Sequence, residues 1–158
     1  MKKTLELDGN EARKLFPVAS VEIKAILLAT FGNDFFNGKI TDRIKTYEDA
    51  CAEIGESPVD ELKMLSDGFT PDEIIYRKLK TVTKALVGNW KADWSNHDQN
   101  KWYPYFRLSS AGFSFHGAGY FYAYASAGVA SRLCFKTDEL ATYAGKQFVE
   151  IWNDIILK

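Results

Sequence analysis

Residues 70–88, TPDEIIYRKLKTVTKALVG, predict the longest helix of the chain. Thr70 is typical of a helix N-cap, Pro71 fits the first helical position, and Glu73 can accept a hydrogen bond from the backbone of the cap. Apolar side chains then recur at helical spacing until Gly88, at Ile75, Leu79, Val82 and Leu86. The stretch therefore predicts an amphipathic helix that buries one face and ends at a glycine.

Shorter helices are predicted on the N-terminal side of this stretch. Asp8, Ser20 and Thr46 each precede apolar residues at helical spacing, and Ser57 with Pro58 is typical of the start of a further, brief helix. The side chains expected to be buried are Ala12, Leu15, Phe16, Ile23, Ile26, Leu27, Phe31, Ala50, Cys51, Ile54, Leu62 and Leu65. Residues 1–88 are thus predicted to be mainly helical.

The composition changes after Gly88. Residues 89–101 are polar and rich in turn-forming side chains, which predicts a connecting loop. Short runs rich in Tyr, Phe and Trp follow, separated by Gly and Ser, and they predict three or four antiparallel strands within residues 101–136. We expect the strands at residues 101–108, 112–116, 119–126 and 131–135, with a hairpin turn at residues 116–119.

A last helix is predicted over residues 138–156, with Thr137 as its cap and an apolar stripe along one side. Gly145 within this helix costs about 1 kcal/mol relative to alanine, so we expect another backbone or ring to approach it closely. The whole pattern predicts a single α+β domain spanning residues 1–158: a helical half, a small antiparallel sheet and a C-terminal helix that covers the sheet.

Composition argues against several classes of protein. The formal net charge is -1, which disfavours a dedicated nucleic-acid protein without excluding one. No apolar run approaches the roughly 20 residues of a membrane helix, and no signal peptide follows Lys2 and Lys3, so we expect a cytoplasmic protein with no membrane partner. The two cysteines and two histidines lack metal-binding spacing, and no cofactor motif is present, so no metal or cofactor is expected.

The sequence also predicts that the chain is not an enzyme, because it contains no paired carboxylates at catalytic spacing and no nucleophile elbow. One alternative remains open. Arg132 and Lys136 flank Cys134 and could lower the pKa of its thiol, with His116 as a base. We favour the interpretation that Cys134 is an inert packing residue, since an unpaired cysteine usually behaves as a small hydrophobic side chain.

Two groups of residues are candidates for a binding site. Arg77, Lys80 and Lys84 share one face of the helix after Thr70, where they could hold phosphates or could simply be solvated. The aromatic candidates follow in the loop and first strand, together with one further cation: Trp90, Trp94, Trp102, Tyr103, Tyr105 and Arg107. Such rings suit base, sugar or protein recognition, although a sheet under helices also buries large rings. We expect Trp94 to be an exposed anchor, because Asp93, Ser95 and Asn96 surround it.

Three stretches carry a resemblance: residues 35–51 (FFNGKITDRIKTYEDAC), 89–106 (NWKADWSNHDQNKWYPYF) and 131–148 (SRLCFKTDELATYAGKQF). Together with the opening helices they resemble a family of small phage- and prophage-encoded proteins of gut Bacteroides-type bacteria, for which no activity is established. The resemblance implies a phage or mobile-element protein, located in the bacterial cytoplasm or in a virion, and it supplies no catalytic residue.

Composition and resemblance together predict a non-enzymatic accessory protein that binds a host or phage macromolecule, either a protein or a nucleic acid. The alternative is a structural or assembly component of a phage particle. The sequence predicts no oligomeric state.

Overall fold

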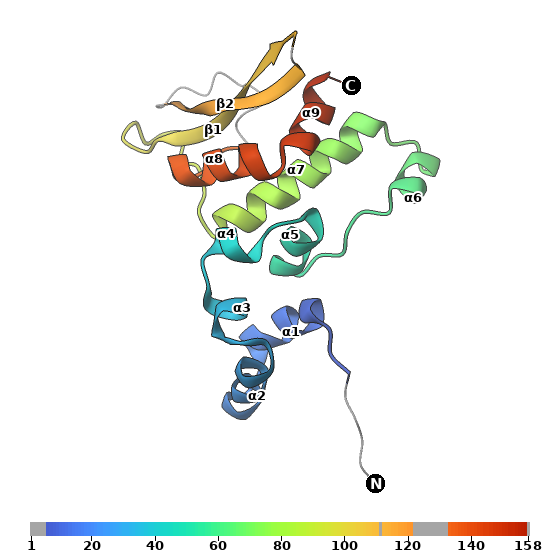
Figure 1. The fold of residues 1–158 in the computed structure, drawn as a ribbon, viewed down its shortest axis with the longest axis vertical. Helices are drawn as coiled ribbons and strands as arrows, with labels where there is room; N and C mark the ends of the chain where they lie inside the picture. The colour runs from blue at the N-terminus through green and yellow to red at the C-terminus, as the bar shows by residue number, and fades with distance from the viewer. Residues whose placement is uncertain (1–5, 111, 122–132, 158) are drawn as a thin grey trace. The chain divides into compact units, whose positions relative to one another are not determined.

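The computed structural model describes residues 6–110, 112–121 and 133–157 (Figure 1). The described residues have an α+β fold in which helices are combined with one antiparallel pair of strands. The chain forms two compact units, residues 1–58 and residues 59–158. All described elements of the first unit are helical, and both described strands belong to the second unit.

The first unit contains short helices: α1 (Gly9–Leu15), the 3-10 helix η1 (Phe16–Val18), α2 (Val21–Phe31), α3 (Asn33–Asn37), α4 (Ile40–Arg43) and α5 (Tyr47–Glu53). The predicted caps are confirmed, because the side chains of Asp8, Ser20 and Thr46 accept hydrogen bonds from backbone N–H groups of α1, α2 and α5. Ala12, Leu27 and Phe36 form a buried cluster among further apolar side chains. The predicted burial of Ile23 and Ile26 is wrong, since both are exposed on a helix whose apolar side chains are spread around its axis instead of lying on one face.

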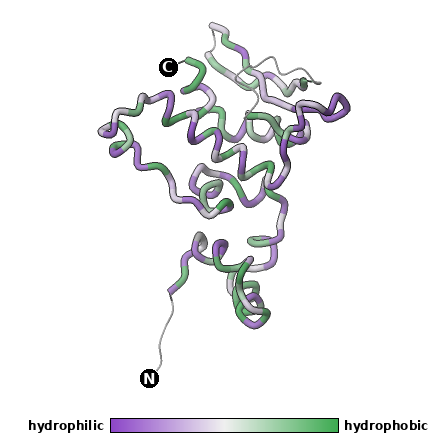
Figure 2. Tube along the Cα trace, turned by 180° about the vertical axis from the view of Figure 1, so that it is seen from behind, coloured by the Kyte–Doolittle hydropathy of each residue, from purple (hydrophilic) through white to green (hydrophobic). Residues whose placement is uncertain are grey.

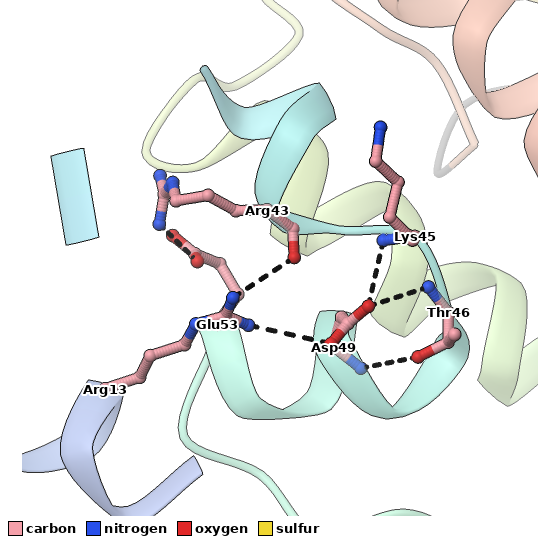
Figure 3. A network of polar contacts seen from close by, with 6 residues as sticks. All are labelled: Arg13, Arg43, Lys45, Thr46, Asp49 and Glu53. Atoms are coloured by element: carbon pink, nitrogen blue, oxygen red, sulfur yellow. Dashed lines mark hydrogen bonds and ion pairs between the residues drawn. The ribbon is translucent and has the colours of Figure 1, made fainter. Parts of the chain in front are cut away.

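Polar contacts join α1 to the α4–α5 segment within this unit (Figure 3). Arg13 Nη2 donates to the Arg43 carbonyl at 3.3 Å, and Arg13 Nη1 lies 3.8 Å from Asp49 Oδ1. Asp49 also accepts from the backbone N–H groups of Lys45 and Thr46, each at 3.0 Å. The contacts of Arg13 bring together side chains from distant positions in the sequence, and no local pattern predicted them. The bonds of Asp49 to the backbone of Lys45 and Thr46 are local and belong to the cap of α5.

The second unit contains α6 (Glu61–Ser66), α7 (Pro71–Val87), β1 (Lys101–Ser109), β2 (Gly112–Phe121), α8 (Asp138–Gln147) and α9 (Val149–Leu157). The helix predicted to begin at Ser57 and Pro58 begins instead at Glu61, because Asp60 is its cap and accepts from the backbone N–H of Lys63. Its buried residue is Met64, whereas the predicted Leu62 is 82% exposed and Leu65 is exposed as well.

The α7 helix confirms the prediction from residues 70–88. Glu73 accepts a hydrogen bond from the backbone N–H of Thr70 at 2.8 Å, and Gly88 ends the helix with φ at 58°. Leu79, Val82 and Leu86 are buried as expected, although Ile74 is more buried than Ile75. Hydrophobic and hydrophilic residues alternate along the tube of this helix in Figure 2, as an amphipathic helix requires.

Within the described residues the sheet has two strands, not the predicted three or four. β1 pairs with β2 in antiparallel register from Lys101 opposite Phe121 to Ser109 opposite Gly112. The predicted turn at residues 116–119 is wrong, since these residues lie inside β2 and the chain reverses between Ser109 and Gly112. Of the last predicted strand, Phe135 forms a single bridge to Trp102, and residues 122–132 lie outside the described part of the chain.

The predicted C-terminal helix is two helices. Its cap is confirmed, because Thr137 Oγ1 accepts from the backbone N–H of Leu140, but the helix is interrupted at Phe148 with φ at −112° and ψ at 29°. The α8 helix covers one face of the hairpin, and α9 packs against α7 (Figure 1). Gly145 of α8 lies against Phe115 and Pro104, so the expected close approach is confirmed.

Candidate functional site

The second unit contains a cavity of about 770 Å³ near the C-terminal end of α7. Its volume lies within the range typical of small-molecule sites in proteins, roughly 300–1,000 Å³. We call it the lysine–tryptophan cavity because its lining includes three lysines and two tryptophans. The complete lining is Lys80, Thr83, Lys84, Val87, Gly88, Asn89, Trp90, Lys91, Ala92, Trp94 and Cys134.

One wall of the cavity is the last part of α7. Lys80, Thr83, Lys84 and Val87 follow one another at spacings of three, one and three residues, so they share one face of the helix. The helix ends at Gly88, and the backbone N–H of Trp90 donates to the Val87 carbonyl at 3.2 Å. This bond turns the chain directly after the helix and holds Trp90 beside the lysines of α7.

The other wall is the loop between α7 and β1, which is mainly hydrophilic in Figure 2. Its side chains bond to its own backbone: Gln99 Oε1 accepts from the Asp93 N–H at 2.7 Å, and Gln99 Nε2 donates to the Lys91 carbonyl at 3.4 Å. Asp93 Oδ1 accepts from the backbone N–H and the hydroxyl of Ser95, at 2.9 and 2.6 Å. These bonds fix the segment that carries Lys91 and Trp94.

Lys101 supports the indole of Trp94 from inside the unit. It is fully buried, with 0% exposure, and its ammonium group lies 5.6 Å from the Trp94 ring centroid. The ammonium also donates to the Asn96 carbonyl at 2.8 Å. A buried cation beneath an aromatic face is an attractive contact, so Lys101 positions the ring at the cavity wall. The predicted exposed anchor is therefore a half-buried ring that is held in place.

The lining of the cavity contains no carboxylate among the described residues. The nearest acidic side chain in the loop sequence is Asp93, and the hydroxyl of Ser95 holds the pKa of its carboxyl below the usual range, with the Ser95 N–H as a further cause. Thr83 is only 4% exposed, and its hydroxyl has no hydrogen-bond partner within the described part of the chain. The cavity thus combines cationic groups with flat rings, and the Thr83 hydroxyl is buried behind its wall.

Cys134 reaches the cavity because Phe135, the next residue, pairs with Trp102 through two backbone hydrogen bonds of 2.9 and 2.7 Å. Burial raises the pKa of the Cys134 thiol, against smaller opposing effects of its own backbone hydrogen bond and of the Lys101 charge. A raised thiol pKa disfavours the thiolate that a nucleophile needs. Arg132, one of the two cations predicted to activate this thiol, lies outside the described residues.

We expect Cys134 to react slowly with iodoacetamide at pH 7, because only the thiolate attacks and burial keeps the thiol protonated. Since Cys134 lines the cavity, a bound ligand should slow the reaction further. Peptide mass spectrometry distinguishes modification of Cys134 from that of the buried Cys51, which serves as the internal control. Reaction of Cys134 as fast as that of free cysteine would contradict this prediction.

The other predicted residues lie in three places. Arg77 is on α7 outside the cavity lining, with its guanidinium 5.9 Å from the Phe69 ring centroid. The ring of Trp102 lies 4.8 Å from that of Tyr120, whereas Tyr103, Tyr105 and Arg107 are at alternate positions of β1. Lys80, Lys84, Trp90 and Trp94 are brought together in the cavity. Sequence reasoning missed Thr83 and Asn89, although a threonine three residues after Lys80 and directly before Lys84 was a usable signal.

Comparison of the chain with models of protein families, with curated proteins and with solved structures gives no match. The resemblance to phage-encoded proteins therefore stays a prediction. No helix within the described residues combines the length and apolarity needed to cross a membrane. In the same part of the chain, no three His, Cys, Asp or Glu side chains form a group that could hold a metal ion.

Proposed function

We propose that this protein binds single-stranded nucleic acid, without chemical turnover, and that the lysine–tryptophan cavity is the binding site. The observation that carries the proposal is the composition of the lining: Lys80, Lys84 and Lys91 beside Trp90 and Trp94, with no carboxylate among the lining residues. Cationic grooves that follow the phosphates, combined with rings on which bases stack, are typical of proteins that bind single strands.

Each part of the lining has a partner in a nucleotide. The lysine ammonium groups can neutralise phosphates and release counterions, whereas an indole can stack on any base because every base has a flat face. An acidic peptide would satisfy the lysines equally well but would leave both indoles without a flat partner, so nucleic acid is the better fit.

The overall charge of the chain does not oppose this proposal. The formal net charge is -1, yet the charge that a ligand meets is set by the groups around the cavity. Since three lysines and no carboxylate line it, the local field attracts an anion even though the whole chain is nearly neutral.

The test is fluorescence anisotropy of a labelled oligothymidylate, titrated with the full chain at several salt concentrations. If each cavity lysine meets one phosphate, log Kd should change with log salt with a slope of about 2 in magnitude. The variant Lys80→Glu with Lys84→Glu should weaken binding by roughly thirtyfold or more at low salt and reduce the slope, because phosphate contacts are lost and like charges face the strand.

The matched control is Lys63→Glu with Arg77→Glu, which changes the net charge equally within the same unit but lies outside the cavity lining. We expect it to bind nearly as the unmodified chain does. Equal loss in the control would mean that long-range charge, not the cavity, drives binding. Absence of binding at low salt, or equal competition by polyglutamate, would overturn the proposal of a nucleic-acid site.

A further inference from the structure

The face of the β1–β2 hairpin opposite α8 carries an arrangement of rings that the cavity does not explain. Tyr103 is paired with Gly119 and Tyr105 with Gly117. A Cβ atom on Gly119 would lie 2.9 Å from Tyr103 Oη, and one on Gly117 would lie 3.0 Å from Tyr105 Cε1. Each tyrosine ring therefore lies across the backbone of β2, in space that only a glycine leaves open.

Two further rings complete this face. Phe121 stacks on Tyr103 with ring centroids 4.3 Å apart and an interplanar angle of 20°, and His116 meets Tyr105 edge-on at 5.2 Å. The register shift between Tyr105 and Phe106 makes room for His116 beside the tyrosine. We call Tyr103, Tyr105, His116 and Phe121 the hairpin aromatic face.

Within the described residues, packing of the hairpin against the helices does not account for these rings. The hairpin contacts α8 and α9 through its other face, where Phe115 and Pro104 meet Gly145 and Phe106 meets Trp152. Tyr105, His116 and Phe121 are exposed, and Tyr103 is half-buried. Contiguous exposed aromatic surface in a folded protein marks a site of interaction more often than a single exposed ring does.

The hairpin aromatic face begins at the wall of the lysine–tryptophan cavity. Successive side chains of a strand alternate between its faces, so Lys101, Tyr103, Tyr105 and Arg107 share one side of β1. Lys101 lies beneath the ring of Trp94, which lines the cavity. The order along β1 is thus the cavity wall, then the two tyrosines about 7 Å apart by strand geometry, then the Arg107 guanidinium.

Charge favours the same ligand on both surfaces. Residues 101–121 contain no aspartate or glutamate, so no carboxylate of this stretch repels a phosphate chain, and Arg107 is exposed whereas Lys101 is buried. Arg107 is exposed and stands opposite Ser114 in the register. Rings that lie on a strand pair, followed by a cation, suit bases that stack in succession while the backbone passes a positive group.

We propose that the hairpin aromatic face is a base-stacking track that extends the nucleic-acid site beyond the cavity, with the stacked pair of Tyr103 and Phe121 holding one base, Tyr105 holding another and Arg107 meeting the phosphate chain. This inference rests on the proposed function. It adds a direction to the proposed site, since the bound nucleic acid leaves the cavity past Trp94 and runs along β1. It also adds a length, since more nucleotides are held than the cavity can contain.

The test compares the affinities of oligothymidylates of three and eight nucleotides for the full chain. We expect the longer oligonucleotide to bind roughly tenfold more tightly, because each stacked base adds affinity. Tyr103→Leu with Tyr105→Leu should abolish this gain and leave the affinity for the short oligonucleotide unchanged. Tyr143→Leu, a tyrosine of α8 away from this face, is the matched control and should retain the gain.

Ser114→Glu is a second variant that leaves the rings in place and sets a carboxylate opposite Arg107 on the exposed hairpin. It should weaken binding of the long oligonucleotide alone, and a photoreactive 5-iodouracil near one end of that oligonucleotide should crosslink to Tyr103 or Tyr105.

Equal affinity for both lengths, with cavity-dependent binding of each, would overturn the track and leave the proposed function standing. The track would also be overturned if both Tyr103→Leu with Tyr105→Leu and Ser114→Glu still bound the longer oligonucleotide more tightly than the shorter one by the same factor as the unmodified chain. Self-association of the chain that the same variants abolish would show that a second copy covers this face. Absence of binding at any length would refute the proposed function itself.

Discussion

Replacing Phe135 by alanine is expected to lower the free energy of unfolding of the second unit by about 3–5 kcal/mol. The side chain of Phe135 has 0% exposure and directly follows Leu133 and Cys134, which are buried as well. Its backbone pairs with Trp102, so the ring is fixed at the start of the hairpin and the surrounding atoms have little freedom to collapse into the space it leaves. Loss of the ring therefore removes buried apolar area and leaves a cavity.

Urea unfolding followed by tryptophan fluorescence measures this effect selectively, because all four tryptophans of the chain lie in residues 59–158. Leu108→Ala is the control: Leu108 is 66% exposed on the same hairpin, so its truncation should change stability by no more than about 0.5 kcal/mol. A loss below about 1 kcal/mol in Phe135→Ala would show that this ring is not part of a packed core.

The helices were predictable because their signals are local. A cap such as Asp8 or Thr46 bonds to a backbone group three residues away, so the residues that decide the helix start are adjacent in the sequence. The error at Ser57 and Pro58 has the same origin, since Asp60 competes as a cap a few residues later and makes the bond. The start of a helix was thus predictable where the sequence offers one cap residue, and it was misplaced where two cap residues lie close together.

The turn of the hairpin was predicted at the wrong residues, because the role of its glycines depends on the opposite strand and not on the local sequence. Gly117 and Gly119 look like turn residues, but they give space to the rings of Tyr105 and Tyr103 on the other strand. The break at Phe148 was missed for a similar reason. The apolar stripe continues through it, while α8 packs on the hairpin and α9 on α7, so tertiary contacts favour two helix directions.

The candidate site was predictable only where its parts are close in the sequence. Lys80 and Lys84 are one helical turn apart, and Trp90 and Trp94 follow directly after the helix, so their convergence needs only one turn of chain at Gly88. Cys134 joins them through the bridge between Phe135 and Trp102, a long-range pairing that no local pattern specifies. Arg77 was included because it shares a helix face with Lys80, yet the cavity begins one turn later.

Replacement of Gly145 distinguishes local from tertiary effects. Helix propensity and tertiary packing predict changes in stability of opposite sign for this replacement. Helix propensity alone predicts that alanine at this position stabilises α8 by about 1 kcal/mol. The structure predicts the reverse, because a Cβ atom would lie 2.6 Å from Phe115 Cε2 and 2.8 Å from Pro104 Cβ. Both neighbours belong to the hairpin that α8 covers, and neither is the far end of a flexible side chain, so the helix would have to move away from the hairpin.

We therefore expect Gly145→Ala to destabilise the second unit and Gly145→Val to cost about 3 kcal/mol, at the upper end of the usual penalty for overpacking. A double-mutant cycle with Phe115→Ala gives the matched comparison. Removing the Phe115 ring opens the space that the valine needs, so the double variant should be more stable than the sum of the single effects by about 1 kcal/mol or more. Fluorescence-detected unfolding measures all four members of the cycle. Additive effects, or a stabilising Gly145→Ala, would show that α8 does not pack against the hairpin through this glycine.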